Sequence, residues 1–154
     1  MNNRDYIILE LIPDAISPDK GNIIQLSALK LHGLKLIDRF DYRLNYDKID
    51  NTDLKTLISY DKDSFEYTDN SEDIIKKFSS WSNNLPLLII DNNYTYNFLS
   101  ELNNEKESIF KYLNLEFSDD VIDKVISKYS LEPSNYIVDL LYEALIFESN
   151  NKDK

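Results

Sequence analysis

The chain has 154 residues, of which 42% are hydrophobic, enough for one independently folding domain. It contains no cysteine, which excludes disulfides and thiolate metal sites and is what we expect of a cytoplasmic protein. With 28 acidic and 17 basic residues its net charge is −11, which disfavours binding of nucleic acid through phosphate contacts.

The N-terminal sequence predicts neither a signal peptide nor a membrane anchor. Polar residues at positions 2–5 precede only a short apolar run, and no apolar stretch approaches the roughly 20 residues that a transmembrane helix needs. We find no internal repeat and no linker. We therefore expect one domain over residues 1–148, a disordered tail over residues 149–154 and no membrane partner.

Three segments with strand character open the chain, at residues 6–11, 22–31 and 34–44. His32-Gly33 lies between the second and the third and predicts a tight turn. Two strands joined by a short turn that contains glycine form an antiparallel hairpin. Residues 13–21 are rich in strand-breaking residues and are expected to connect the first strand to the second.

The middle of the chain alternates between polar and apolar segments. Residues 45–70 are polar, with one helical turn expected at 54–60. A helix is predicted over residues 70–81, with Ser71 as its N-cap. One face of that helix is apolar: Ile74, Ile75, Phe78 and Trp81. The run "LLII" at residues 87–90 follows Pro86 and predicts a buried central strand.

The C-terminal half is expected to be mostly helical. Helices are predicted after residue 92 and over residues 105–129, with a break at 115–119. The last helix is predicted to begin at Pro133 and Ser134. Its apolar stripe consists of Ile137, Leu140, Leu141, Ala144 and Leu145. This order of elements predicts an α/β or α+β layered domain in which a mixed β-sheet carries helices.

Several segments together carry a resemblance to a known family. "NIIQLSALKL" and "LIDRFDYRLN" are similar to its second and third strands, and "EDIIKKFSSWSNNLPLLII" to the helix and strand that follow. "IDNNYTYNFL" resembles its second motif, His-Asn-x-x-Phe-Asp-x-x-Phe-Leu, and "VDLLYEA" its closing motif, His-x-x-x-x-Asp-Ala. The family is that of the DEDD 3′–5′ exonucleases, which are proofreading-type nucleases. Over residues 6–147, the resemblance implies an α/β fold with a ribonuclease H-like mixed β-sheet, in which three antiparallel N-terminal strands plus parallel strands are flanked by α-helices.

The resemblance places the family's catalytic positions on residues that depart from its pattern. The first aspartate falls on Glu10, and the glutamate two residues later falls on Ile12. The aspartate of the second motif falls on Thr95, or on Tyr96 if the register slips by one. The catalytic motifs are therefore expected to be degenerate.

The closing motif departs from the family in the same way, because its histidine base falls on Val138 and its aspartate on Glu143. Hydrolysis by two metals needs several carboxylates that hold cations roughly 4 Å apart. Glu10 and Glu143 remain as candidate metal ligands, and the resemblance would bring them together. The alternative for both is a solvated charge, at a strand end and on a helix surface. The one histidine, His32, is expected in the hairpin turn.

Two further groups of residues have both a functional and an ordinary interpretation. Asp119, Asp120 and Asp123 resemble a metal-binding run, but the glycine and the final glutamate of a calcium loop are missing. They are expected to be acidic residues at the start of a helix. Tyr94 and Tyr96 are the best candidates for stacking on nucleobases, yet such platforms normally accompany a positive groove.

No such groove is evident, because the most basic segment, residues 30–43, also contains acidic side chains. The basic residues there are Lys30, Lys35, Arg39 and Arg43, and they alternate with Asp38 and Asp41. The first functional hypothesis is therefore an exonuclease-like domain without catalysis or cofactor, a binding or regulatory module with a protein partner. The alternative is a weak or divergent 3′–5′ exonuclease that acts on single-stranded DNA or RNA with Mg²⁺ or Mn²⁺. A third is an acidic mimic of nucleic acid.

Overall fold

The first three strands form an antiparallel meander. The computed structural model describes residues 4–13, 23–49, 65–90, 93–134 and 137–152. In it, β1 (Asp5–Pro13) pairs with β2 (Ile23–His32), and β2 pairs with β3 (Lys35–Leu44), both antiparallel. Gly33 has a positive φ of 59° in the tight turn between β2 and β3, a conformation that glycine adopts without steric cost. The predicted hairpin is confirmed.

Parallel strands extend this meander on both sides. β5 (Leu87–Ile89) pairs with β1, and β6 (Lys106–Ser108) pairs with β5. At the other edge, β4 (Glu66–Thr68) pairs with the end of β3. The strand order is β4-β3-β2-β1-β5-β6. The predicted α/β class with its mixed sheet is confirmed, and so is the buried central strand after Pro86.

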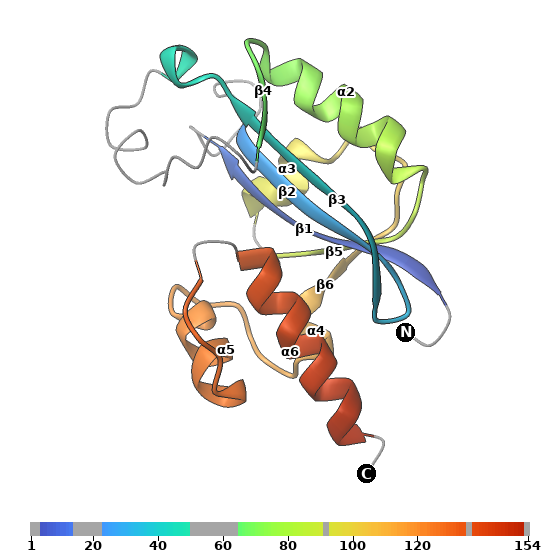
Figure 1. The fold of residues 1–154 in the computed structure, drawn as a ribbon, viewed down its shortest axis with the longest axis vertical. Helices are drawn as coiled ribbons and strands as arrows, with labels where there is room; N and C mark the ends of the chain where they lie inside the picture. The colour runs from blue at the N-terminus through green and yellow to red at the C-terminus, as the bar shows by residue number, and fades with distance from the viewer. Residues whose placement is uncertain (1–3, 14–22, 50–64, 91–92, 135–136, 153–154) are drawn as a thin grey trace.

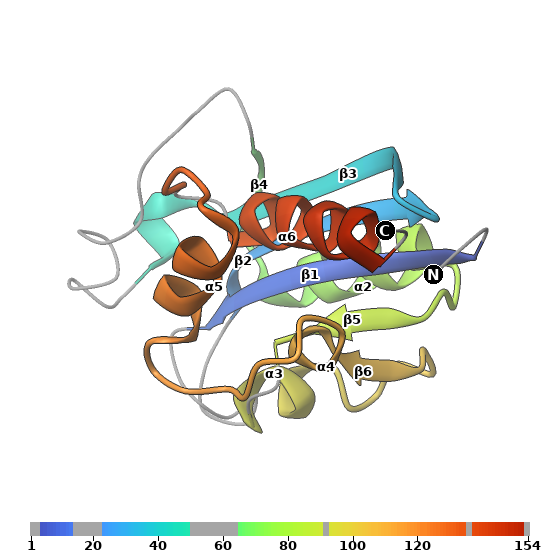
Figure 2. The same cartoon turned by 90° about the horizontal axis from the view of Figure 1, so that it is seen from below.

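Helices cover both faces of the sheet (Figures 1 and 2). Helix α2 (Ser71–Ser82) lies on one face, and α6 (Ile137–Lys152) lies on the other with α5 (Val121–Tyr129) beside it. The short elements are η1 (Tyr46–Lys48), α3 (Asn93–Phe98) and α4 (Ile109–Tyr112). Among the described helices, none is long and apolar enough to span a bilayer.

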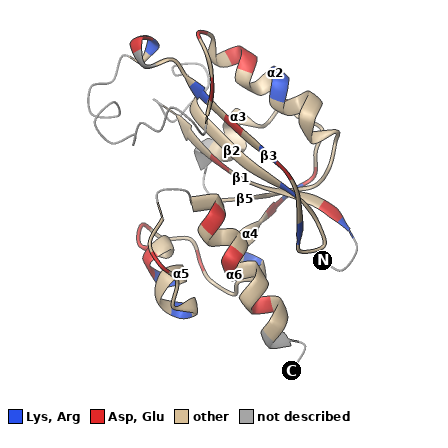
Figure 3. Cartoon of the chain, viewed as in Figure 1, with Lys and Arg blue, Asp and Glu red and all other residues tan. Residues whose placement is uncertain are grey.

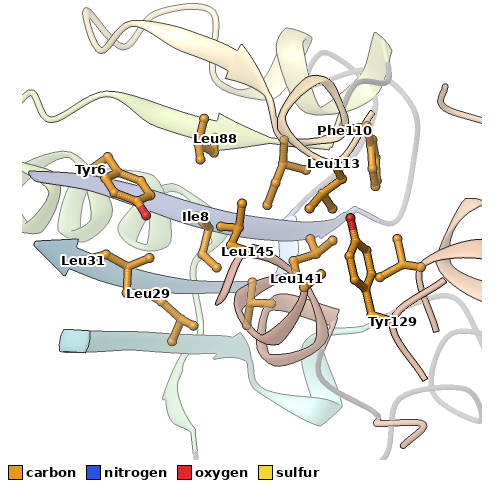
Figure 4. Close-up of a cluster of buried hydrophobic side chains, with 14 of the residues drawn as sticks. Tyr6, Ile8, Leu29, Leu31, Leu88, Phe110, Leu113, Tyr129, Leu141 and Leu145 are labelled. Atoms are coloured by element: carbon orange, nitrogen blue, oxygen red, sulfur yellow. The ribbon is translucent and has the colours of Figure 1, made fainter. Parts of the chain in front are cut away.

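Each face of the sheet has its own hydrophobic core, because side chains on a strand alternate between the two faces. On the α2 face, Phe40 of β3 packs against Phe78 with their ring centroids 5.5 Å apart. On the α6 face, Leu141 and Leu145 lie toward Ile8 of β1 (Figure 4). The second core holds α6, and with it the start of that helix, in a fixed position over β1 and β2.

The structure corrects four expectations about these elements. β6 lies in the segment 105–129 that was predicted to be helical, and the edge strand β4 was not predicted. Helix α6 is described from Ile137, beyond Pro133 and Ser134, and it runs to Lys152, into the segment expected to be a disordered tail. The predicted connection at 13–21, apart from Pro13, and the helical turn at 54–60 lie outside the described residues.

The N-cap of α2 is Asn70 rather than the predicted Ser71. The Asn70 side chain accepts a hydrogen bond from the Glu72 backbone N–H at 2.9 Å, whereas the Ser71 hydroxyl accepts one from the Ile23 N–H. We expect Asn70→Ala to lower the free energy of unfolding by about 1 kcal/mol, because a helix N–H loses its partner. Urea denaturation measures this difference. Ser80→Ala, on the exposed side of the same helix, is the control and should cause no loss.

Candidate functional site

The candidate site lies on the α6 face of the sheet, where a row of polar side chains crosses three strands. Glu10 of β1 is paired with Ser27 of β2, and Ser27 is paired with Asp41 of β3. Directly paired residues of antiparallel strands point to the same face. Glu10 is only 3% exposed, so it is not the solvated residue at a strand end that the sequence left open.

The first turn of α6 covers the Glu10 carboxyl group. The backbone N–H groups of Ile137 and Val138 donate hydrogen bonds to it. Its second oxygen, Oε1, is buried and has no hydrogen-bond partner among the described residues. Burial raises the pKa of Glu10 from 4.5 to about 8, the Asp139 and Asp41 carboxylates add to the rise, and the two N–H groups oppose it. Glu10 is therefore mainly protonated at neutral pH.

Arg39 links the sheet to α6 at the same place. Its Nε donates to Asp41 Oδ2 at 3.1 Å, and one terminal nitrogen donates to Asp139 Oδ1 at 2.8 Å. Burial acts to lower the pKa of Arg39, but the hydrogen bonds to the two carboxylates outweigh it and raise the pKa. The guanidinium is thus a permanent positive charge. Asp41 Oδ1 is buried and lacks a partner among the described residues.

The structure places the other predicted site residues as follows. Val138 has no exposed surface and belongs to the core on the α6 face. Thr95 is buried in α3, and Ile12 is partly buried near the end of β1. Glu143 lies on the exposed surface of α6. The α6 carboxylate that acts on the pKa of Glu10 is that of Asp139, one helical turn before Glu143.

The sequence interpretation did not select Asp41, Asp139 and Arg39 as site residues. The sequence does place Arg39 and Asp41 together, because they are two residues apart on a predicted strand and therefore point to the same face of the sheet. Asp139 could be found only from the position at which α6 begins. Among the described residues, no three His, Asp or Glu side chains are arranged to hold a metal ion. The donors present thus do not fit the metal pair that the resemblance implies.

Two other sequence predictions concern charged residues away from this row. His32 is the last residue of β2 and pairs with Lys35, so it does not lie in the hairpin turn in which the sequence placed it. Its Nδ1 lies 2.5 Å from Asp5 Oδ1. Asp5 and His32 are paired in register at the start of β1, the opposite end from Glu10. Asp120 is the N-cap of α5 and Asp123 lies in its first turn, which confirms their assignment to a helix start.

A separate open cavity of about 420 Å³ lies near the β6 edge of the sheet. It is lined by Tyr96, Lys106, Glu107, Ser108, Lys111 and Tyr112. The Lys106 ammonium donates to the carbonyl oxygens of Leu102 and Asn104, and the Tyr112 hydroxyl donates to Glu107. The charged groups of the lining are thus mostly engaged in intramolecular bonds. The side chain of Tyr94 lies outside the described residues.

The strand order, with α6 over the antiparallel half of the sheet, defines a ribonuclease H-like α/β fold. The product-bound structure of exonuclease I at 1.5 Å resolution is similar to this chain, with a TM-score of 0.59 and 13% sequence identity. The match covers 97% of this chain but 43% of exonuclease I, so this chain spans less than half of that protein. At this identity the likeness shows the fold alone. No protein-family model and no curated protein matches the sequence.

Proposed function

We propose that this chain is a non-catalytic module with an exonuclease-like fold, which binds or regulates a protein partner. The observation that carries the proposal is the burial of Glu10 beneath the first turn of α6. A metal ligand must direct its lone pairs at an accessible cation. Glu10 instead accepts hydrogen bonds from the helix backbone and is mainly protonated at neutral pH.

The positions around Glu10 support the same conclusion. Val138, which the resemblance places at the general base, is an apolar residue of the core, and Ile12 offers methyl groups where the family has a second carboxylate. Under this proposal the module needs no metal and no cofactor. General-base catalysis requires a group within hydrogen-bond reach of the attacking water, and neither hydrocarbon side chain can take up a proton.

A protein partner is favoured over nucleic acid by the charge of the surface. With a net charge of −11, the chain would repel a phosphate backbone. Acidic residues recur along α6, while β3 carries both signs (Figure 3). The proposed partner surface is therefore acidic, and those of the 11 tyrosines that are not buried are expected to contribute to it.

A nuclease assay tests the loss of catalysis. We expect end-labelled single-stranded DNA and RNA to keep their full length when incubated with the chain in Mg²⁺ or Mn²⁺. Glu10→Gln, purified in the same way, should give the same result, and an active exonuclease serves as positive control. If the wild type shortens either substrate and Glu10→Gln does not, the proposal is wrong.

The second candidate is the divergent 3′–5′ exonuclease, and one observation favours it. Asp41 and Asp139 lie close enough to Glu10 to raise its pKa, so the site brings three acidic side chains near one another although the family motifs are degenerate. On this alternative, substrate and cation would have to displace Arg39 from Asp41 and Asp139. Activity that disappears in both Glu10→Gln and Asp139→Asn would support it.

A further inference from the structure

The carboxylates of the candidate site already have a cation between two of them. Arg39 reaches Asp41 at 3.1 Å and Asp139 at 2.8 Å, so one guanidinium bridges the central sheet and α6. A planar guanidinium has several donors in a fixed arrangement and can serve two carboxylates at once. A divalent cation between two carboxylates would perform the same electrostatic task.

We propose that the Arg39 guanidinium takes the place of a divalent cation between Asp41 and Asp139, and so prevents this carboxylate site from binding metal. The inference rests on the proposed loss of catalysis, and it names Arg39 as the residue that keeps metal ions out of the site. It goes beyond the degenerate motifs, because Arg39 lies in none of the segments that carry the family's catalytic positions.

Two observations besides the ion pairs point to a site that is built for a positive charge. Glu10 Oε1 and Asp41 Oδ1 are buried without a hydrogen-bond partner among the described residues. Buried carboxylate oxygens without partners are costly and rare. Both belong to the row that Glu10, Ser27 and Asp41 form across the sheet. Glu10 and Asp41 thus each keep one oxygen that could accept a hydrogen bond, next to the ion pairs of Arg39 with Asp41 and Asp139.

The balance of charge explains why one arginine is enough to exclude metal. The charged groups on this side of the sheet near the site are Glu10 from β1, Arg39, Asp41 and Arg43 from β3, and Asp139 from α6, while Ser27 of β2 is neutral. Arg43 is buried, and it donates hydrogen bonds to Gln25 Oε1 at 2.6 and 3.0 Å. With Arg39 in place, its charge offsets one of the two carboxylates that it contacts. A divalent ion would then have to approach a positive charge at contact distance, a repulsion that solvent only partly screens because the Arg39 side chain is 39% exposed. Without Arg39, Asp41 and Asp139 lose the guanidinium that contacts both of them.

Among the described residues no three acidic side chains are arranged to hold a metal ion, so replacement of Arg39 should open a weak site between the two carboxylates of Asp41 and Asp139. Arg39→Met keeps the apolar stem and removes the charge. We expect the unfolding temperature of this variant to rise by about 3 °C or more, saturably, in about 10 mM Mn²⁺ or Mg²⁺, with no such rise for the wild type. Isothermal titration calorimetry with MnCl₂ measures the same binding directly. The double variant Arg39→Met/Asp139→Asn should lose the response, since one of the two freed carboxylates is then neutral.

Arg39→Gln keeps the test decisive if Arg39→Met does not fold. The glutamine amide is neutral and keeps hydrogen-bond donors, so a response to the same metals is expected, as for Arg39→Met. The inference is overturned if folded Arg39 variants bind no metal, or if the wild type itself shows a saturable response that Asp139→Asn abolishes. Neither result depends on nuclease activity, so failure here is distinct from failure of the proposed loss of catalysis.

Discussion

Glu10→Gln should stabilise the protein at alkaline pH, and the gain over wild type should shrink as the pH falls. The rise in the pKa of Glu10 from 4.5 to about 8 means that the folded state holds its proton more tightly than the unfolded chain does. At about 1.4 kcal/mol for each pH unit, the full effect has an upper limit of about 5 kcal/mol. Glutamine keeps the shape of the side chain and never ionises, so it lacks this dependence.

The sign of the pH dependence follows from the same linkage. The contribution of the Glu10 proton to stability is fully present below pH 4.5. It is lost as the pH rises toward 8, because the unfolded state releases the proton first, and above 8 it no longer changes. Urea denaturation of wild type and Glu10→Gln between pH 4 and pH 9 gives the difference in free energy of unfolding at each pH. Using the difference cancels the titration of the other acidic residues.

Glu143→Gln is the matched control, because it is the same substitution at an exposed position. Its difference from wild type should remain nearly constant over the same pH range, since exposed charges contribute little. A flat profile for Glu10→Gln as well would show that the Glu10 carboxyl group is reached by solvent or paired with a cation. It would remove the argument from burial on which the proposed function depends.

The elements that could be predicted from the sequence are those whose own residues determine them. The three N-terminal strands show alternation and a glycine turn, and the strand after Pro86 is a continuous apolar run. β4 and β6 have only three residues each, "EYT" and "KES". Neither has a hydrophobic pattern of its own, so their pairing is decided by the neighbouring strands. This is why β4 was not predicted and β6 fell inside a predicted helix.

The candidate site, too, could be predicted only in the parts that local sequence determines. Glu10 was found because a charge within an apolar strand is unusual, but its burial depends on α6, which is far away in the chain. Asp139 and Glu143 are four residues apart and share a face of the helix, so the helical pattern does not decide which of them approaches Glu10. That choice depends on where α6 begins over the sheet. The ion pair between Arg39 and Asp139 likewise joins residues 100 positions apart.

Val138→His should destabilise the protein strongly, although it restores the residue type that the resemblance expects at this position. Val138 has no exposed surface and packs in the same cluster as Ile8 and Leu141. The imidazole is larger and polar, and it would lose hydrophobic contacts while burying nitrogen atoms that need partners. We expect a loss of about 4 kcal/mol in the free energy of unfolding, measured by urea denaturation.

Glu143→His places the same side chain on the exposed surface of α6 and should change stability by no more than about 0.5 kcal/mol. Comparison of the two variants distinguishes a buried position, 138, from an exposed position, 143. If Val138→His costs less than about 1 kcal/mol, position 138 has room for an imidazole and is not a core position in solution. A base could then be restored there. The large loss that we expect instead means that, on this backbone, the aligned position cannot host a general base, because its side chain supports α6 on the sheet.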